Sequence, residues 1–271
     1  MKVMKFGGTS VGSPERMKGV AQLITKSGEP TFVVLSAMSG TTNSLVEISD
    51  YLYKKNPEGA NEVINNLEKK YMLHIEQLYS TDEYKEKTRE FLTGEFNYLR
   101  SFTKDLFTSF EEKTIVAQGE IMSTNMMVNY LQEQGVKAVL LSALDFMRTD
   151  KNAEPDLQYI KEKLKGVMDA NADQQIYLTQ GFICRNAYGE IDNLQRGGSD
   201  YPSSVRHCLL TRSKFGPTST ACITMTPVWL TRQRPCVSLT SRKLPSSLIL
   251  VRRSCILPAC SLPSMPAFPY A

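Results

Sequence analysis

The chain has 271 residues, of which 41% are hydrophobic and 22% charged, enough for one large globular domain or two modest ones. No apolar run is long enough to span a bilayer, and the first ten residues lack the apolar core of a signal peptide. These features argue against a membrane-spanning or secreted protein, so we expect a cytoplasmic protein with no membrane partner.

The net charge of +4 averages two unlike segments. Residues 1–201 carry 23 Lys or Arg and 28 Asp or Glu, whereas residues 202–271 carry nine Lys or Arg and neither Asp nor Glu. The second segment also holds five of the six cysteines and nine of the thirteen prolines. This shift predicts a boundary after Tyr201. A basic tail of this kind is typical of a disordered extension, or of an arm that binds nucleic acid or a membrane surface.

The first part of the chain alternates strands, glycine-containing turns and helices. An apolar strand is predicted over residues 2–6, and a helix follows with Ser13 as its N-cap and Pro14 at its first position. A second buried strand is expected at 31–37 and another helix at about 44–55. This order predicts a parallel sheet with crossover helices.

The middle of the chain favours longer helices. Residues 59–110 contain two predicted helices, and the second carries an apolar stripe at helical spacing formed by Leu92, Phe96, Leu99, Thr103 and Leu106. The later elements are a helix at 112–134, strands at 137–146 and 175–183 with a helix at 156–170 between them, a hairpin turn at 186–190 and a glycine-rich helix start at 195–201. After Tyr201 no periodic pattern persists, so no secondary structure is predicted there.

Three glycine-containing turns each follow a strand and precede a helix, at residues 5–10, 36–43 and 195–200. Such turns present backbone N–H groups at a helix N-terminus, where an anion is favoured, and in a parallel sheet they meet at the carboxyl ends of the strands. Together they favour a phosphate site, although each could be only a tight turn. Lys5, beside the first turn, could neutralise phosphate charge during transfer or be a solvated lysine at a strand edge.

Three further charged residues are candidates for ligand binding. Glu120 lies in a mostly uncharged stretch, so its carboxylate needs water, a partner or a cationic ligand, unless it lies on an exposed helix face. Arg196, beside two glycines, could bind a carboxylate through two hydrogen bonds. Asp200 could equally serve to complement a helix dipole. The P-loop and G-x-G-x-x-G signatures are absent, and His74 has no Cys or His partner for zinc.

These turns belong to a set of motifs that resembles aspartate kinases, a branch of the amino-acid kinase family. The matching segments, in family order, are KFGGTSV (5–11), LSAMSGTTN (35–43), GEIMST (119–124), MRTD (147–150), TQGFI (179–183) and RGGSDY (196–201). The resemblance covers residues 1–201 continuously. It implies an α/β fold, a three-layer α/β/α sandwich with a largely parallel central sheet that draws strands from both sides of Tyr201. Residues 1–201 would be an incomplete catalytic domain.

The resemblance also implies an activity and its residues. The reaction would be ATP-dependent phosphorylation of the side-chain carboxylate of L-aspartate, the first step towards lysine, threonine and methionine, with ATP and Mg²⁺ as cofactors. ATP would contact Lys5, Gly7, Gly8 and Ser10, and Asp200 would position Lys5 as its catalytic partner. Aspartate would contact Ser39, Thr42, Glu120, Arg196 and Ser199, with Glu120 near its ammonium group.

The same resemblance limits the partners. No side chain is assigned to a metal, no nucleic-acid partner is expected, and the intact protein is expected to form a homo-oligomer. Another small-acid substrate, or an inactive fragment that only binds ligand, remains an alternative.

The family motifs expected after Tyr201 are missing, namely T-D-x-x-G-x-x-x-x-D-P-R, F-G-A-K-x-L-H-P and two regulatory ACT domains. A change of reading frame accounts for this. With permitted synonymous codons, the overlapping codons from Gly216 through Val228 can read TDIDGMHNNDPR, and those between Leu250 and Pro258 can read GAKILHP. We therefore hypothesise that residues 202–271 are a non-native, disordered tail translated out of frame, rather than a nucleic-acid-binding arm.

Overall fold

The computed structural model describes residues 1–104, 106–194, 205 and 222–225, the last of these by their backbone alone. The chain divides into two units, Met1–Ser238 and Leu239–Ala271. All described residues belong to the first unit. No helix among them is long and apolar enough to cross a membrane.

A five-stranded parallel sheet forms the centre of this unit, with the strand order β3-β4-β2-β1-β7. The strands are β1 (Lys2–Phe6), β2 (Thr31–Leu35), β3 (Ala138–Leu141), β4 (Ile176–Gln180) and β7 (Cys222–Met225). All five residues of β2 are buried, as expected for a central strand covered on both faces. A separate antiparallel hairpin joins β5 (Ile183–Arg185) to β6 (Ile191–Asn193).

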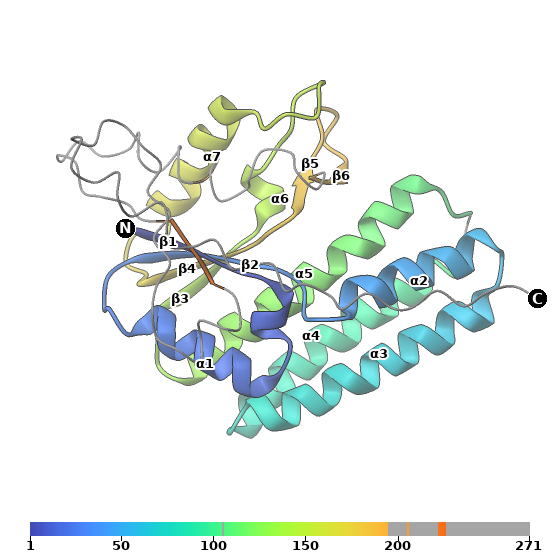
Figure 1. The fold of residues 1–271 in the computed structure, drawn as a ribbon, viewed down its shortest axis with the longest axis horizontal. Coiled ribbons are helices and arrows are strands. Elements are labelled where there is room, and N and C mark those ends of the chain that lie inside the picture. Colours follow the sequence, from blue (N-terminus) through green and yellow to red (C-terminus); the bar gives the residue numbers. More distant parts are fainter. Residues whose placement is uncertain (105, 195–204, 206–221, 226–271) are drawn as a thin grey trace, which may run out of the picture. The chain divides into compact units, whose positions relative to one another are not determined.

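Helices cover both faces of the sheet, which gives three layers (Figure 1). On one side lies α1 (Pro14–Thr25), which follows the short 3₁₀ helix η1 (Gly8–Val11). On the other side lie α6 (Ala143–Phe146) and α7 (Leu157–Asp169). Two apolar clusters fill the spaces between the layers. Alternate residues of each strand point to opposite faces, so Met4 and Phe6 join the α1 cluster whereas Val3 joins the α7 cluster.

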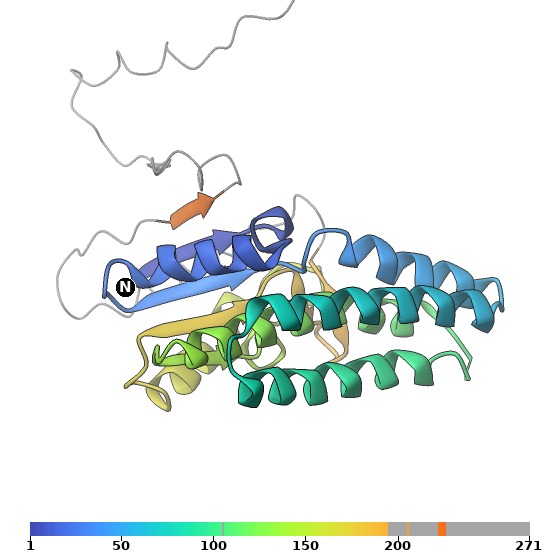
Figure 2. The ribbon, with the colours of Figure 1, turned by 90° about the horizontal axis from the view of Figure 1, so that it is seen from below.

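A helical bundle extends the α1 side of the sheet. It consists of α2 (Thr41–Tyr53), α3 (Pro57–Leu78), α4 (Asp82–Ser101) and α5 (Ser109–Glu133), which lie side by side in Figure 2. Each packs against two of the others, and α5 also packs against the sheet. Almost every residue of α5 from Thr114 to Leu131 is therefore buried, and this helix connects the sheet to the bundle.

The start signal predicted for α1 is confirmed, whereas the helix expected at 112–134 begins earlier, at Ser109, after a capping box that was not predicted. The Ser13 side chain accepts a hydrogen bond from the Arg16 amide, with Pro14 at the first position of α1. A capping box between Thr108 and Glu111 starts α5. Each cap satisfies amides that the helix itself leaves without partners.

Several predicted boundaries are wrong. The strand expected at 137–146 ends at Leu141, because residues Ala143–Phe146 form one helical turn. The strand expected at 175–183 ends at Gln180, and Ile183 starts the hairpin whose turn was correctly placed at 186–190. The apolar stripe of α4 is buried only as far as Leu99, since the helix ends at Ser101 and Leu106 is 90% exposed.

The sequence also predicted no secondary structure after Tyr201, and this is wrong for one segment. The backbone of residues 222–225 forms β7, which pairs in parallel with β1, Val3 opposite Cys222 and Phe6 opposite Met225. Strand pairing uses backbone groups that every residue except proline carries, and residues 222–225 contain no proline. The sheet thus includes a strand from the tail, which was expected to be disordered. Apart from the buried Val205, the rest of the tail lies outside the described residues.

Candidate functional site

The predicted site residues that the structure describes lie near the carboxyl ends of the central strands. Phe6, Leu35 and Gln180 end β1, β2 and β4 and lie in register across the sheet. Two hydrogen bonds join the chain just beyond them, from the Ser36 amide to the Phe6 carbonyl (3.1 Å) and from the Gly181 amide to the Leu35 carbonyl (2.8 Å). Since the carboxyl ends of parallel strands are where such sheets bind ligands, this edge is the candidate site.

The first two glycine-containing turns touch each other at this edge. A Cβ atom built on Gly8 would lie 2.6 Å from the Ala37 carbonyl oxygen, a distance that real Cβ atoms do not show. A Cβ atom built on Gly7, one residue earlier, would have no atom of a described residue within 4 Å, its chain neighbours aside. Gly8 is therefore required for the close approach of the two turns, whereas Gly7 is not.

Replacing Gly8 with alanine is expected to lower the melting temperature clearly, because backbone atoms of one turn must move away from the other. The loss should be about 1–3 kcal/mol of unfolding free energy. Gly7→Ala is the matched control and should unfold close to the unaltered chain. Thermal unfolding followed by circular dichroism tests this pair, and equal melting temperatures for the two variants would contradict the contact.

The loop from Ser36 to Gly40 leads directly into α2. Gly40 adopts a left-handed conformation (φ +82°) and is the N-cap of this helix, with no side chain bonded to the first amides. The sequence predicted a start at Ser44, but α2 begins at Thr41. Thr42 consequently lies in the first turn, half-buried, next to an exposed Ser39. The N-terminal end of α2 is thus suited to an anion.

Glu120 reaches the same loop from α5. Its side chain is only 4% exposed. One carboxylate oxygen accepts a hydrogen bond from the Ala37 amide (3.3 Å), and the other is buried with no hydrogen-bond partner among the described residues. Burial raises the pKa of Glu120 to about 7, with a partly compensating effect of the Ala37 hydrogen bond. A buried carboxylate oxygen without a partner lowers the stability of the fold. Because the side chain is buried, the alternative interpretation as an exposed helix-face carboxylate is wrong.

Neighbouring residues of the same motif hold α5 in place. The Ser123 hydroxyl donates to the Ser36 carbonyl (2.9 Å), and the Gln180 amide donates to the Thr124 hydroxyl (3.0 Å). Gly119 leaves room for the loop, because a Cβ there would lie 2.9 Å from the Ala37 Cβ. These contacts fix the position of Glu120 relative to β2 and β4. These residues lie within the motifs that carry the family resemblance, but the sequence alone indicated no role for them.

The raised pKa of Glu120 predicts a pH-dependent stability. Its folded pKa of about 7 exceeds the ordinary value of 4.5, so the folded chain binds the proton more tightly than the unfolded chain does. The resulting stabilisation is complete below about pH 4.5 and is lost as the pH rises through 7, by about 3 kcal/mol in all. Glu120→Gln should therefore gain stability over the unaltered chain between pH 5 and pH 8. Urea unfolding at both pH values measures this, and a constant difference would contradict the raised pKa.

The remaining predicted residues divide into two groups. Lys5 lies near the end of β1, half-buried, in register with Val34. Because β1 has β2 on one side and β7 on the other, the interpretation as a strand-edge lysine is wrong. Ser10 is fully buried in η1, and its amide donates to the Gly7 carbonyl (2.9 Å). Arg196, Ser199 and Asp200 lie outside the described residues.

Two residues of α3 that were not predicted from the sequence contact the loop and the start of α2. The Lys70 ammonium donates to the Ser39 carbonyl (2.8 Å). The Tyr71 hydroxyl shares a hydrogen bond with the Thr41 hydroxyl (3.1 Å). Tyr71 occupies an apolar position of an amphipathic helix, and lysines are common on exposed helix faces, so the sequence carries no signal for either contact.

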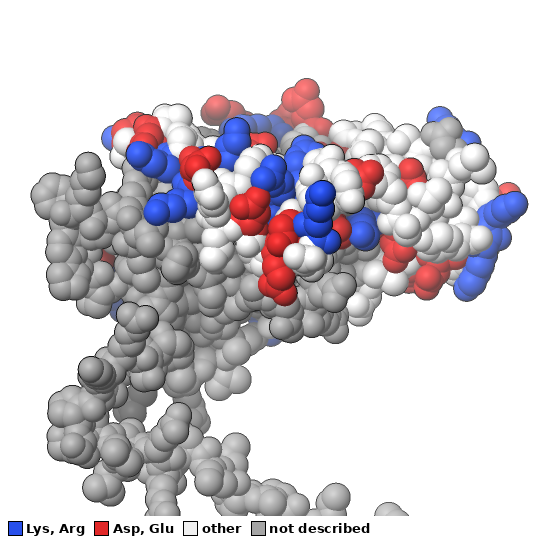
Figure 3. Space-filling view, turned by 90° about the horizontal axis from the view of Figure 1, so that it is seen from above, with Lys and Arg blue, Asp and Glu red and all other residues white. Residues whose placement is uncertain are grey.

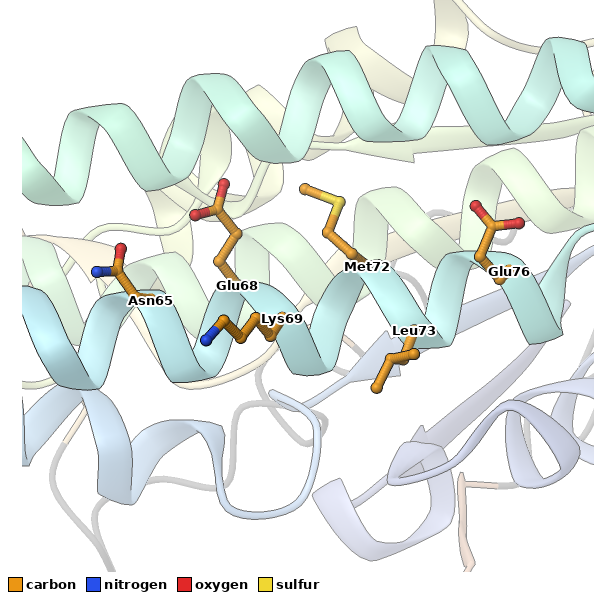
Figure 4. Close-up of a pocket in the computed structure, with 6 residues that line it drawn as sticks. All are labelled: Asn65, Glu68, Lys69, Met72, Leu73 and Glu76. Carbon is orange, nitrogen blue, oxygen red and sulfur yellow. The ribbon is translucent and has the colours of Figure 1, made fainter.

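The surface of the described residues has two further features. A pocket of about 660 Å³ is lined, among the described residues, by six side chains of α3: Asn65, Glu68, Lys69, Met72, Leu73 and Glu76 (Figure 4). The face seen from above carries intermingled acidic and basic side chains (Figure 3). None of the predicted site residues belongs to the described lining of the pocket.

Comparison with known proteins agrees with this architecture. The model of the amino acid kinase family matches residues 1–205. This chain belongs to the amino acid kinase family. Within the family it is similar to lysine-sensitive aspartokinase 3 of Escherichia coli, 30% identical over 206 residues that make up 75% of this chain and 45% of the relative. It is also similar to aspartokinase 1, chloroplastic, of Arabidopsis thaliana, 33% identical over 219 residues, 75% of this chain and 37% of the relative.

Solved structures of the family share the fold. Aspartokinase III of E. coli in complex with lysine and aspartate has a TM-score of 0.66 and 27% identity, covering 77% of this chain and 47% of the other. The same enzyme with aspartate and ADP has a TM-score of 0.65 and 26% identity, covering 84% and 49%. The three-layer α/β fold is thereby confirmed. The chain spans less than half the length of these relatives.

Proposed function

We propose that this chain carries the substrate-binding part of an ATP-dependent aspartate kinase, which forms 4-phospho-L-aspartate. The observation that carries the proposal is the buried Glu120 carboxylate beside the Ser36–Gly40 loop, one oxygen of which has no hydrogen-bond partner in the part of the chain that the structure describes. An amino acid offers an ammonium group that would pair with this oxygen. The similar aspartokinases, one of which was solved with aspartate and ADP, support aspartate as that amino acid.

The proposed roles follow the charges of the substrate. Glu120 binds the ammonium group, while Thr42 and Arg196 bind the two carboxylates, with Ser39 and Ser199 as supporting contacts. Lys5 and the backbone amides at Gly7 and Gly8 bind the phosphates of ATP, next to Ser10, and Asp200 positions Lys5. The start of α2, which no side chain caps, adds a partial positive charge where a carboxylate would lie.

The transfer itself requires little acid–base chemistry. A side-chain carboxylate has a pKa of about 4 and is already ionised at neutral pH. One of its oxygens attacks the γ-phosphorus of ATP, the bond from that phosphorus to the β–γ bridging oxygen breaks, and ADP leaves. The protein must align the two anions and offset their repulsion, which is the role proposed for Lys5 and the amides of the first turn.

We propose Mg²⁺ as the ion that accompanies ATP. Among the described residues no group of three or more His, Cys, Asp or Glu could hold a metal. This fits an ion bound mainly through nucleotide phosphates and water, as Mg²⁺ commonly is. When bound, it would neutralise phosphate charge during transfer.

Calorimetry with aspartate, followed by trapping of the acyl phosphate with hydroxylamine in the presence of ATP, tests the proposal. We expect the chain to bind aspartate in preference to glutamate and other small acids. Saturable binding of another small acid, with none of aspartate, would replace the substrate. Binding of aspartate without turnover would identify a ligand-binding fragment, the alternative that the missing nucleotide motifs favour.

We also infer that residues 202–271 are translated out of frame and that residues 1–201 are an incomplete catalytic domain. The absence of acidic residues after Asp200 and the two family motifs readable in one shifted frame support this. The family match, which ends at residue 205, is compatible with it. Sequencing the gene across codons 195–271 tests the inference, and a confirmed reading frame over this stretch would reject it.

A further inference from the structure

Two consecutive residues of α3 contact the Ser36–Gly40 loop and the first residue of α2, which adjoins Thr42. Lys70 donates to the Ser39 carbonyl (2.8 Å), and Tyr71 shares a hydrogen bond with the Thr41 hydroxyl (3.1 Å). Both contacts join residues about 30 positions apart in the chain. They flank Gly40, whose left-handed conformation sets the direction in which α2 begins.

Tyr71 is a rigid anchor. Its side chain is fully buried, and its ring packs edge-on against Phe96 of α4, with the ring centroids 5.7 Å apart. The hydroxyl is therefore held in place by the packing of the bundle, and Thr41, also fully buried, is its partner. Burial raises the pKa of Tyr71, and the nearby Glu120 carboxylate adds to this rise. Tyr71 thus remains a neutral hydrogen-bonding group at any working pH.

The Lys70 side chain holds the loop by a hydrogen bond to the loop backbone. A Cβ built on Gly40 would lie 3.7 Å from the Lys70 ammonium nitrogen, so the side chain passes directly beside this glycine. The His74 ring, one turn further along α3, hydrogen-bonds the Lys70 carbonyl (2.7 Å). The ammonium places a positive charge under a loop whose proposed ligands are anions.

We propose that Lys70 and Tyr71 are positioning residues that set the geometry of the substrate-binding loop, so that the helical bundle controls the affinity for the amino-acid substrate. This inference rests on the proposed function. Neither residue is assigned a contact with substrate. Their effect is transmitted through Ser39 and Thr41, which adjoin the proposed carboxylate ligand Thr42.

Two conservative variants remove one contact each. Tyr71→Phe deletes the hydroxyl and keeps the ring packed on Phe96, and Lys70→Met deletes the ammonium and keeps most of the stem. Thr41→Val removes the same hydrogen bond as Tyr71→Phe by changing its other partner. This variant replaces Tyr71→Phe in the test if Tyr71→Phe folds poorly. Lys70→Arg should restore part of the effect because the guanidinium can donate to the same carbonyl.

The chain provides matched controls. The Tyr79 hydroxyl donates to the Met126 carbonyl (2.7 Å) inside the bundle, and the Lys18 ammonium donates to the Gln77 carbonyl (2.8 Å) near the end of α3. Tyr79→Phe and Lys18→Met therefore lose the same kinds of hydrogen bond without touching the loop. A general loss of stability would affect these controls as much as the test variants.

The experiment measures aspartate affinity of the full chain by calorimetry and hydrogen exchange of peptides covering the Ser36–Gly40 loop. We expect the dissociation constant to rise roughly fivefold to tenfold in Tyr71→Phe and Lys70→Met, the effect of one lost hydrogen bond. Loop amides should also exchange faster in these variants, and neither change should occur in the controls.

Each contrary result has its own meaning. An unaltered chain that binds aspartate, with unchanged affinity and loop exchange in both test variants, would overturn the positioning role alone. An unaltered chain that does not bind aspartate would overturn the proposed function, and the role of the anchors in substrate affinity with it. Equal losses of affinity in test and control variants would reduce the contacts to general stabilisation and reject the inference.

Discussion

Replacing Lys5 with alanine is expected to lower the rate of phosphoryl transfer by about a hundred- to a thousandfold, in a protein whose gene has been restored to the family reading frame after codon 201. Lys5 is the second-last residue of a strand with neighbours on both sides, two residues before the turn that starts at Gly7. A fixed cation at this position stabilises the charge that develops during transfer, and loss of such a group typically costs about 2.7–4 kcal/mol of transition-state stabilisation.

Lys2→Ala is the matched control for Lys5→Ala. Lys2 belongs to the same strand but lies at its other end, where it forms an exposed ion pair with Glu29 (2.9 Å). Exposed pairs contribute little to stability, so this variant should turn over like the unaltered protein. Single-turnover measurements at saturating ATP separate transfer from binding. A Lys5→Ala protein that is folded and transfers phosphate at nearly the normal rate would remove Lys5 from the catalytic site.

Replacing Glu120 with alanine is expected to weaken aspartate binding by about 2–5 kcal/mol and to leave ATP binding nearly unchanged. In this variant the ammonium group of the substrate would enter a buried site that lacks the opposite charge. The free energy of binding then falls mainly because the ammonium group is left unpaired. The variant itself should fold, because it removes a buried carboxylate whose second oxygen has no hydrogen-bond partner among the residues described. Arg196→Ala is expected to act in the same way on a substrate carboxylate.

Glu133→Ala supplies the comparison for Glu120→Ala. Glu133 is a carboxylate of the same helix, and it accepts hydrogen bonds from the amides of Ser80 and Thr81 (2.8 and 2.7 Å) at the far end of α5. Its loss should lower stability without changing affinity for aspartate. Titrations of both variants with aspartate and with ATP test whether Glu120 binds aspartate. A fall in ATP affinity, with aspartate binding intact, would show that Glu120 has been assigned to the wrong ligand.

The sequence predicted the order of strands and helices well because the elements that line the site carry strong local signals. Short apolar runs ending in glycine identify β1 and β2, and Ser13 and Pro14 identify the start of α1. Glu120 could be singled out since a carboxylate in an uncharged stretch needs a partner. Its link to the Ala37 amide could not be predicted, because that hydrogen bond joins residues 83 positions apart.

The errors have a common physical cause. Lys70 and Tyr71 occupy ordinary helix positions, and only the packing of α3 against the loop gives them a role. Residues Ala143–Phe146 follow an apolar strand after a single polar residue, Ser142, and their helical turn is joined to distant Gln180, whose side-chain oxygen accepts a hydrogen bond from the Ala143 amide (2.8 Å). The strand at residues 222–225 forms beside β1, and no local pattern announces a partner more than two hundred residues away.

That last pairing has a consequence for how the protein is made. The strand β1 leaves the ribosome first, yet its second neighbour in the sheet, β7, is synthesised about 220 residues later. At about 5–20 residues per second, one edge of β1 waits roughly ten to forty seconds for its partner. The bundle of α2 to α5, whose members follow one another in the chain, needs no such wait. We expect the nascent chain to acquire its helices early and to expose an open strand edge throughout translation, where chaperones would have to shield it from other chains.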